Sequence, residues 1–428
     1  MLFTIFFYVF MFISLINLVH LGMYLVGANL YDIRSFRKER AKRQRNRRNV
    51  LVSILIPAHN EEKSIVRCLD SVRQSTVRNL EIVVIDDAST DRTLEIVNEY
   101  IRRHPDFNRP IRAIRCIENV GKAAALNRAL AGGLKGEFVM TLDADSVLHP
   151  NAIQNAVDYM IDDPTVAGVA ANVRVMDSMS VLGLLQKFEY MVGYRSKKFY
   201  TMSNSEFIVG GVASTYRYAT LKEVGFYPDD VQTEDIALSL KVTSLGSRTH
   251  KLVYAYDVIA MTEGVQTFRA LLRQRYRWKL GSMQSLFKHR NLFMNGSNAH
   301  SKALTWYRIP MSFMGEIIVL TEPIMLAVII YLSFMALSLQ AFVGAYTLIT
   351  LYLLWNIWPD EHMKFTQKLK MTTYTPIMYF LFYVMNAVQF VAVVRCLIHL
   401  GQVTGREATA STWTSPERGG DTSVAQFV

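Results

Sequence analysis

Long apolar stretches lie at both ends of this chain and enclose a middle region in which short apolar and polar segments alternate. Residues 2–30 are almost continuously apolar, and a second apolar region runs from about residue 309 to residue 400. Because about 20 apolar residues cross a bilayer as a helix, we expect one transmembrane helix before the middle region and about three after it. A secretory signal peptide is the alternative at the amino terminus, but its apolar part would be shorter and would follow a basic segment.

A run of positive charge follows the first apolar stretch. Between Arg34 and Arg48 the sequence has nine Lys or Arg residues and one Glu. Positive charge accumulates on the cytoplasmic side of membrane spans, which places the amino terminus outside and the middle region inside the cell. The net charge of +11 is also typical of nucleic-acid-binding proteins, but the run has a single aromatic residue, Phe36, and no series of interleaved aromatic residues that could stack on bases. We therefore expect membrane lipids as partners and no nucleic acid.

The middle region alternates between two kinds of pattern. Short apolar runs predict strands, and the segments between them have helical periodicity; the strands are expected at 51–57, 80–86, 111–117 and 137–143, and the helices at 62–74, 91–103 and 122–131. Such alternation predicts an α/β domain with a mostly parallel sheet covered on both faces. Ligands of open parallel sheets bind beyond the carboxyl ends of the strands. Asp86 and Asp143 stand at two of these ends, so we expect them to meet at one crevice.

The cysteine residues indicate the cellular compartment of the domain. Cys68, Cys116 and Cys396 are widely separated and form neither a disulfide framework nor a CxxC metal site, which suits a reducing cytosol.

The chain divides into an N-terminal transmembrane helix (1–30), a basic juxtamembrane segment (31–49), the α/β domain (50–265), an amphipathic interfacial helix (266–300), a C-terminal transmembrane region (301–400) and a flexible tail (401–428).

The first acidic motif follows the second predicted strand. Asp86 and Asp87 stand between a strand and a helix, where carboxylates can accept hydrogen bonds from a nucleobase imide or from ribose hydroxyls. Helix capping is the alternative for this segment, and Ser89, Thr90 and Asp91 are all good capping residues. We assign capping to these three residues and ligand binding to the two acids.

The second acidic motif is Asp143-Ala144-Asp145. Residues two apart in an extended segment direct their side chains to one side, and two carboxylates at a strand end suit Mg²⁺ or Mn²⁺ shared with a diphosphate. Ordinary loop acids are the alternative. Lys122 precedes this motif and begins a predicted helix, where it could meet a phosphate or a base edge; the surrounding sequence is not a P-loop.

A third acidic motif, Thr233-Glu234-Asp235, precedes an apolar helical segment. Acids in the first turn of a helix often serve only as capping and dipole partners. Transfer of a sugar with inversion, however, needs one base that takes the proton of the attacking hydroxyl, and Asp235 is our candidate for that base.

The last motif, Gln274-Arg275-Tyr276-Arg277-Trp278, lies in a helix-like stretch that begins near Thr267. Arg277 could bind phosphate, and Trp278 offers an apolar face on which a sugar ring can stack. An amphipathic helix lying on the inner leaflet is the alternative. We expect the helix to be interfacial and also to bind substrate.

In order and spacing, these motifs resemble the membrane-embedded processive enzymes of glycosyltransferase family 2, which include the cellulose, chitin, hyaluronan and poly-β-1,6-N-acetylglucosamine synthases. The resemblance covers roughly residues 50–290 and implies a GT-A fold and a UDP-sugar donor. By resemblance, Pro57 and Glu61 belong to the first strand and its nucleotide loop, Asp86 and Asp87 are the uridine-binding acids, and Lys122 is the base-contacting lysine. The resemblance also makes Asp143 and Asp145 the metal-binding pair and Asp235 the base of the triplet with Thr233 and Glu234. Gln274, Arg277 and Trp278 correspond to the QxxRW signature.

The resemblance also implies a function. Compact size makes the chain most similar to the poly-β-1,6-N-acetylglucosamine synthases, so we expect an inverting processive enzyme in the cell membrane that polymerises UDP-N-acetylglucosamine with Mg²⁺ or Mn²⁺. The growing polysaccharide would be the acceptor and would pass through the protein's own spans, and accessory membrane or envelope subunits would be further partners. The alternatives are a hyaluronan- or chitin-type synthase, a single-transfer enzyme acting on a lipid-linked acceptor, and an inactive subunit that scaffolds a partner.

One feature of the tail conflicts with the expected topology. The segment Trp413–Arg418 resembles a motif that, in some relatives, closes over the nucleotide, and this would require a cytoplasmic tail. With the amino terminus outside, one span before the domain and three after it would instead place the tail outside the cell.

Overall fold

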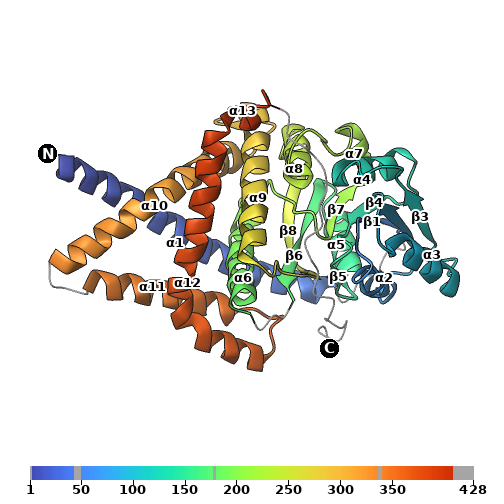
Figure 1. The fold of residues 1–428 in the computed structure, drawn as a ribbon, viewed down its shortest axis with the longest axis horizontal. Coiled ribbons are helices and arrows are strands. Elements are labelled where there is room, and N and C mark those ends of the chain that lie inside the picture. Colours follow the sequence, from blue (N-terminus) through green and yellow to red (C-terminus); the bar gives the residue numbers. More distant parts are fainter. Residues whose placement is uncertain (1, 43–49, 177–179, 336–339, 408–428) are drawn as a thin grey trace.

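The computed structural model describes residues 2–42, 50–176, 180–335 and 340–407. An α/β domain forms one side of the molecule, and long helices from both ends of the chain form the other (Figure 1). The end of the basic run beyond Lys42 and the Trp413–Arg418 segment lie outside the described residues.

An eight-stranded sheet forms the centre of the domain, in the order β3-β2-β1-β4-β7-β6-β8-β5. The strands are β1 (Val52–Ala58), β2 (Leu80–Asp86), β3 (Ile111–Arg115), β4 (Phe138–Thr141), β5 (Val147–Leu148), β6 (Val166–Val175), β7 (Ser214–Arg217) and β8 (Lys251–Thr262). Neighbouring strands are parallel in the pairs β1–β2, β2–β3, β1–β4 and β6–β8. Strand β7 is antiparallel to β4 and β6, and β5 is antiparallel to β8. The expected α/β domain with a mostly parallel sheet is confirmed.

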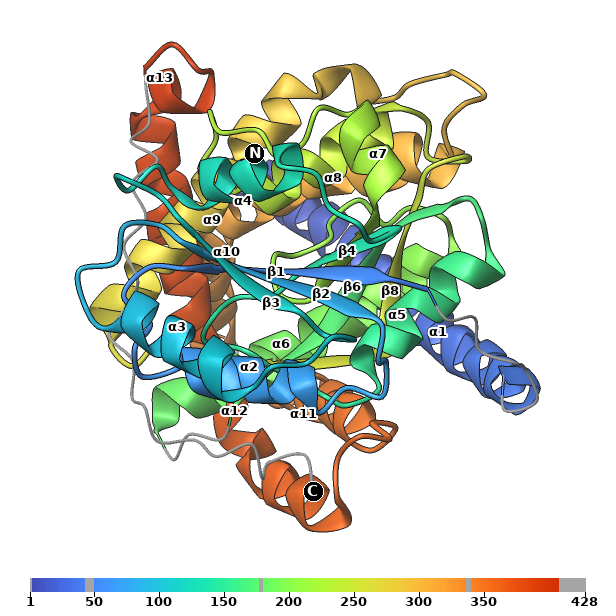
Figure 2. The same cartoon turned by 90° about the vertical axis from the view of Figure 1, so that its right-hand side faces the viewer.

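Helices cover both faces of the sheet (Figure 2). One face packs against α2 (Ile65–Arg73), α3 (Thr93–Arg103) and α5 (Ala152–Asp162), and the other against α4 (Lys122–Ala131), α7 (Tyr218–Glu223) and α8 (Glu234–Ser244). Successive residues of β1 alternate between the two cores: Ile54 and Ile56 lie in the first and Leu55 in the second. Because a strand buried on both faces needs apolar residues at every position, the central strands are continuous apolar runs in the sequence.

Strand β4 ends earlier than the sequence predicts. It stops at Thr141, and the chain then turns, with the backbone N–H of Ser146 donating to the carbonyl oxygen of Asp143 at 2.9 Å. Asp143 and Asp145 therefore stand in a turn at the carboxyl end of the sheet and not in the strand. By contrast, β2 and α4 begin and end at the predicted residues.

Three helices of the described chain are long and apolar enough to cross a membrane. They are Met11–Ser35 within α1 (Leu2–Lys42), Ala303–Val328, which begins before α10 (Ile309–Met335) and ends within it, and α12 (Phe365–Ile398). The apolar part of α11 (Gln340–Ile357) is shorter and comprises Tyr346–Ile357. Helix α1 continues to Lys42, so the first basic residues after residue 31 extend the apolar helix.

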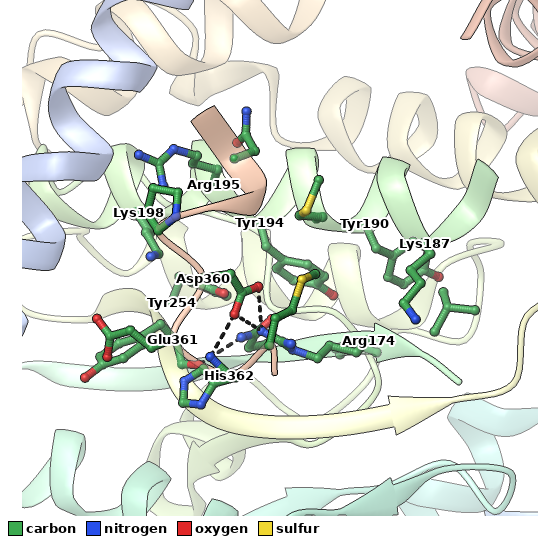
Figure 3. A pocket seen from close by; sticks show the side chains of 18 residues that line it. Arg174, Lys187, Tyr190, Tyr194, Arg195, Lys198, Tyr254, Asp360, Glu361 and His362 are labelled. Carbon is green, nitrogen blue, oxygen red and sulfur yellow. Dashed lines mark hydrogen bonds and ion pairs between the residues drawn. The ribbon is translucent and has the colours of Figure 1, made fainter. Parts of the chain in front are cut away.

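The segments before and after helix α12 are hydrogen-bonded to β6 and to α9. Before it, Asp360 accepts two hydrogen bonds from Arg174 of β6 at 2.8 Å, beside a small cavity of about 80 Å³ (Figure 3). After it, the carbonyl oxygen of Gln402 in α13 (Leu400–Val403) accepts a hydrogen bond at 3.0 Å from Gln284 of α9 (Phe268–Lys288). Between these contacts α12 lies alongside α9 (Figure 1). The two ends of α12 therefore lie beside the same folded unit.

We expect Asp360→Asn to lower the thermal unfolding midpoint in detergent by about 2 °C. The substitution leaves the guanidinium of Arg174 without its carboxylate, and a lost hydrogen bond to a charged group costs about 1.5–3 kcal/mol, which corresponds to roughly 1 °C for each kcal/mol in a chain of 428 residues. Glu95→Gln is the matched control, because it removes an exposed acid from its pair with Arg92 and should hardly move the midpoint. An unchanged midpoint for Asp360→Asn would mean that apolar packing alone holds this end of α12.

Candidate active site

A cavity of about 610 Å³ lies at the carboxyl ends of the central strands and extends to α9. Ten of the residues predicted from the sequence line it: Glu61, Lys122, Asp143, Asp145, Thr233, Glu234, Asp235, Gln274, Arg277 and Trp278. These residues come from five separate segments of the chain, so the fold brings the predicted motifs together. Pro57, Asp86 and Asp87 are not among the residues that line the cavity.

Lys122 connects two of the acidic motifs. Its Nζ donates to Oδ1 of Asp143 at 2.6 Å and lies 3.3 Å from Oε1 of Glu234 at the start of α8. Burial lowers the pKa of Lys122, but Asp143 and Glu234 raise it, and the resulting pKa lies above its usual value. Lys122 is therefore a permanent cation that draws the two acidic motifs to one wall of the cavity.

Asp143 and Asp145 fit a divalent cation that takes its other ligands from a substrate. The side chain of Asp143 is 28% exposed to the cavity. Asp145 is buried, and its Oδ1 accepts hydrogen bonds from Ser146 at 2.8 Å and from Thr262 at 3.3 Å. Within the described ranges, no group of three or more His, Cys, Asp or Glu residues is placed to hold a metal ion. A hard cation at this pair would therefore share the oxygen atoms of a bound diphosphate, as Mg²⁺ commonly does.

Asp235 is oriented by two backbone donors. Its Oδ2 accepts a hydrogen bond from the N–H of Gly211, and its Oδ1 from the N–H of Ile236, both at 2.8 Å. Burial and the neighbouring Glu234 raise the pKa of Asp235 to about 6, although Lys122 and the two N–H groups oppose them. A carboxylate with a raised pKa is ionised at neutral pH and binds a proton more tightly than an ordinary aspartate, as a general base requires.

Helix α9 presents Gln274, Arg277 and Trp278 to the cavity. Arg275, between them, turns inward: it is 1% exposed, forms an ion pair with Glu189 of α6 (Val181–Met202), and its guanidinium lies 4.2 Å from the centre of the Trp278 ring. Stacking of a guanidinium on an indole is favourable. Arg275 therefore fixes the orientation of Trp278 and ties α9 to α6.

The acids at the end of β2 differ in their surroundings. Asp87 accepts hydrogen bonds from the N–H groups of Val120 and Gly121, both at 2.9 Å, so it holds the loop that positions Lys122. Asp86 is 1% exposed, and neither of its carboxylate oxygens has a hydrogen-bond partner within the part of the chain that the structure describes. A buried carboxylate without partners is costly, and Asp86 is thus available to donors on a ligand. Pro57 lies in β1, opposite Ile85 of β2.

Several residues of the cavity were not predicted from the sequence. Helix α6 contributes Glu189, Tyr190, Tyr194, Lys197 and Tyr200, the loop before β7 contributes Glu206, and the segment before α10 contributes Arg308. None of these residues belongs to a spaced motif. They reach the cavity because α6 and α9 pack beside the sheet, which residue spacing within one segment does not reveal.

Comparison with known sequences finds a family that resembles most of the domain. Residues 53–225 match the family described as Glycosyl transferase family 2. Poly-beta-1,6-N-acetyl-D-glucosamine synthase of Staphylococcus epidermidis is 31% identical over 243 residues, which cover 55% of this chain and 56% of that protein. The synthase of the same name from Staphylococcus aureus strain COL is 30% identical over 241 residues, with the same shares of 55% and 56%. The match thus spans about half the length of these curated relatives.

A solved structure extends the likeness to the fold of most of the chain. A mannosyltransferase from Pyrobaculum calidifontis, in complex with GDP-Man and Mn²⁺, aligns with a TM-score of 0.54 and 21% sequence identity, covering 90% of this chain and 98% of that one. The expected GT-A fold with flanking apolar helices is confirmed.

We expect Gly281→Ala to destabilise the protein by about 1–3 kcal/mol, the usual cost of forcing a methyl group into a packed site. A Cβ at Gly281 of α9 would lie 2.2 Å from Oγ1 and 2.7 Å from the backbone nitrogen of Thr233, so α9 and the start of α8 would have to separate. The control is Gly315→Ala in α10, where a Cβ has no neighbour within 4 Å and where alanine favours the helix. Equal unfolding midpoints for the two variants would contradict the close contact at Thr233.

Proposed function

We propose that the protein is a membrane-embedded, inverting glycosyltransferase that extends a polysaccharide from a UDP-sugar, because residues 53–225 match the family described as Glycosyl transferase family 2. The observation that carries the proposal is that one cavity holds the acids of the second and third motifs, Lys122 and the QxxRW residues of α9. Such a set supplies groups for a nucleotide diphosphate at one end and for a sugar acceptor at the other.

The donor end is formed by Lys122, Asp143 and Asp145, and we add Asp86 at the carboxyl end of β2. The two buried oxygens of Asp86 that have no partner among the described residues suit the imide N–H of uracil and the hydroxyls of ribose. Asp143 and Asp145 would hold Mg²⁺ or Mn²⁺, which when bound neutralises charge on the diphosphate. Arg277 of α9 adds a guanidinium that can bind a phosphate oxygen.

Asp235 supplies the base. It accepts the proton of the attacking hydroxyl as that oxygen forms a bond to the anomeric carbon of the donor, and the bond from this carbon to the β-phosphate oxygen breaks on the opposite side. The products are the extended saccharide, UDP and a protonated Asp235, which returns its proton to solvent. One displacement inverts the anomeric configuration, so an α-linked donor gives a β-linked product.

The surroundings of α9 favour a processive enzyme. Arg275 stacks on Trp278, and Trp278 lines the same cavity as Asp235. There the ring of Trp278 can stack on the acceptor sugar. The likeness to poly-beta-1,6-N-acetyl-D-glucosamine synthases favours N-acetylglucosamine as the sugar. A single-transfer enzyme with a lipid-linked acceptor is the second candidate, because the same donor groups and base would serve one transfer as well as many.

The contacts of α12 place the end of the described chain beside the domain. Arg174 binds the segment before α12 and Gln284 binds the segment after it, while α12 itself is long and apolar enough to cross a membrane. The basic residues that follow the apolar part of α1 favour the cytoplasmic side of the membrane for the domain.

A donor screen tests the proposal. Purified protein in nanodiscs with Mn²⁺ or Mg²⁺ would receive each UDP-sugar alone, and UDP release and product size would both be recorded. A long homopolymer from UDP-N-acetylglucosamine is the expected result. A singly glycosylated lipid would favour the second candidate, a product formed only from two donors would favour a hyaluronan-type synthase, and no UDP release from any donor would contradict the proposal.

Asp235 should govern both turnover and its pH dependence. Because burial raises its pKa to about 6, the ionised base is present above that pH, and turnover should fall about tenfold for each pH unit below it. Asp235→Asn should reduce turnover by about 10²–10⁴-fold, the usual contribution of a general base, while UDP affinity changes little. Normal turnover by this variant, or a pH profile that is flat between pH 5 and pH 7, would remove the assignment.

Trp278→Ala should shorten the polymer more than it slows the release of UDP, because loss of the ring removes the stacking surface for the acceptor and leaves the donor end intact. Product length by gel filtration and UDP release by a coupled assay check this. Trp355→Ala, which removes a tryptophan that is 53% exposed on α11, is the control. Products of unchanged length from Trp278→Ala would argue for single transfer.

A further inference from the structure

The end of α9 beyond the QxxRW residues contacts the chain that leads into the base triplet. Gly281 lies so close to Thr233 that a Cβ at this position would be 2.2 Å from Oγ1 of Thr233. About one helical turn later, Oε1 of Gln284 accepts a hydrogen bond at 3.0 Å from the backbone N–H of Gln232. Residues three apart lie on the same face of a helix. One face of α9 therefore supports the residues that directly precede Glu234 and Asp235.

This face continues the one that lines the cavity. Gln274, Arg277, Gly281 and Gln284 recur at intervals of three, four and three residues, which is the spacing of a single stripe along a helix. The first two residues line the cavity, and the last two do not. Helix α9 thus has one half that faces the substrate site and a second half that supports the wall of that site.

The side-chain amide of Gln284 is used at both of its ends. The residue is 4% exposed, its Oε1 accepts from Gln232, and its Nε2 donates to the carbonyl oxygen of Gln402 at 3.0 Å. Gln402 in turn accepts a hydrogen bond from the hydroxyl of Tyr276 at 3.3 Å. Because an amide carries its acceptor and its donors on different atoms, the contact with Gln402 turns the amide so that its oxygen faces Gln232. The two contacts together require a glutamine at this position.

The segment that Gln284 holds is the entry into the helix of the base. Gln232 and Thr233 line the cavity, and Thr233 is the N-cap residue of α8, whose first turn contains Asp235. A threonine at this position usually fixes the helix start with its side chain. Here its Oγ1 makes no capping bond and has no hydrogen-bond partner within residues 2–42, 50–176, 180–335 and 340–407. The hydrogen bond from Gln232 to Gln284 therefore holds this entry in place of a cap.

We propose that Gln284 is a positioning residue for the base: it holds the chain before α8, and thereby keeps the carboxylate of Asp235 directed at the acceptor hydroxyl. Gln284 itself does not line the cavity, so it acts through Gln232 and not on the substrates. Displacement of a catalytic group by a fraction of an ångström is enough to slow a reaction strongly. This inference rests on the proposed function, because it takes Asp235 as the base.

Gln284→Met is the first variant, because methionine keeps the length of the side chain, removes both hydrogen bonds and adds no charge. UDP release from UDP-N-acetylglucosamine would be measured with Mn²⁺ in nanodiscs. At pH 8 we expect turnover to fall about tenfold, as the loss of one or two hydrogen bonds predicts, while the KM of the donor changes by less than about twofold. A lower unfolding midpoint with normal turnover of the folded protein would show that Gln284 serves packing alone, and would overturn the inference.

The pH profile separates positioning from packing. Burial is the largest cause of the raised pKa of Asp235, so a looser entry into α8 would admit water and lower this pKa. The fall of turnover on acidification should then begin at a lower pH in Gln284→Met than in the unchanged protein. The titratable groups that interact with Asp235 are Glu234 of α8, Lys122 of α4, Lys197 and Tyr194 of α6, and Tyr216 of β7. The substitution changes none of them, and a profile that does not move would contradict the positioning role.

Gln284→Glu is the second variant, because it keeps the acceptor for Gln232 and loses the donor to Gln402. Hydrogen–deuterium exchange would be followed in residues 229–236 and 400–405 of the full-length protein. Gln284→Met should exchange faster than the unchanged protein in both segments, and Gln284→Glu in the second segment alone, with turnover near normal. Gln74→Met, exposed at the end of α2, is the control for a Gln-to-Met change and should alter neither exchange nor turnover.

Two results would overturn the inference whatever the substrate. One is equal exchange of residues 229–236 in Gln284→Met and in the unchanged protein. The other is an equal loss of turnover in Gln284→Glu and Gln284→Met, which would show that the bond to Gln232 is not the one that matters. Failure of the proposed function has a different signature, namely no UDP release from any donor by the unchanged protein, and the exchange measurement does not depend on it.

Discussion

The ammonium of Lys122, placed among carboxylates from distant parts of the chain, is the interaction on which the site depends. At an effective dielectric constant of 20, two opposite unit charges 4 Å apart attract by about 4 kcal/mol, and Lys122 has Asp143 and Glu234 at shorter distances than this. That attraction outweighs the burial of the ammonium, which is why its pKa lies above its usual value. Without Lys122, the turn after β4 and the first turn of α8 would place several negative charges around one cavity with no positive charge between them.

The same wall also sets the chemistry of Asp235. Burial and Glu234 raise its pKa, and Lys122 together with the N–H groups of Gly211 and Ile236 keeps the rise moderate. A buried acid without these opposing groups would have a still higher pKa and would be ionised in a smaller fraction of molecules at neutral pH. The loop that holds Lys122 is in turn fixed by Asp87 through two backbone N–H groups, so an acid that does not line the cavity still controls it.

The opposite wall depends on close packing between helices. Gly281 lets α9 approach Thr233 at the start of α8, and the pair of Arg275 with Glu189 joins α9 to α6. These contacts bring Trp278 and the base to a common cavity. Helix α12 packs along the outer side of α9 and is held at both ends by Arg174 and Gln284, so the apolar part of the chain supports the wall that would bind the acceptor.

The α/β domain follows from the sequence, because a strand buried on both faces must be apolar throughout and the helices between such strands have a different period. Local motifs, together with their resemblance to a glycosyltransferase family, also identified ten residues of the cavity. The tertiary structure alone shows that Asp143 stands in a turn, that Asp87 supports a loop, and that Arg275 is buried against Glu189 and Trp278 instead of lining the cavity. Lys197, Glu206 and Arg308 had no signal at all, because contacts between segments a hundred residues apart depend on how helices pack, and no local pattern encodes that packing.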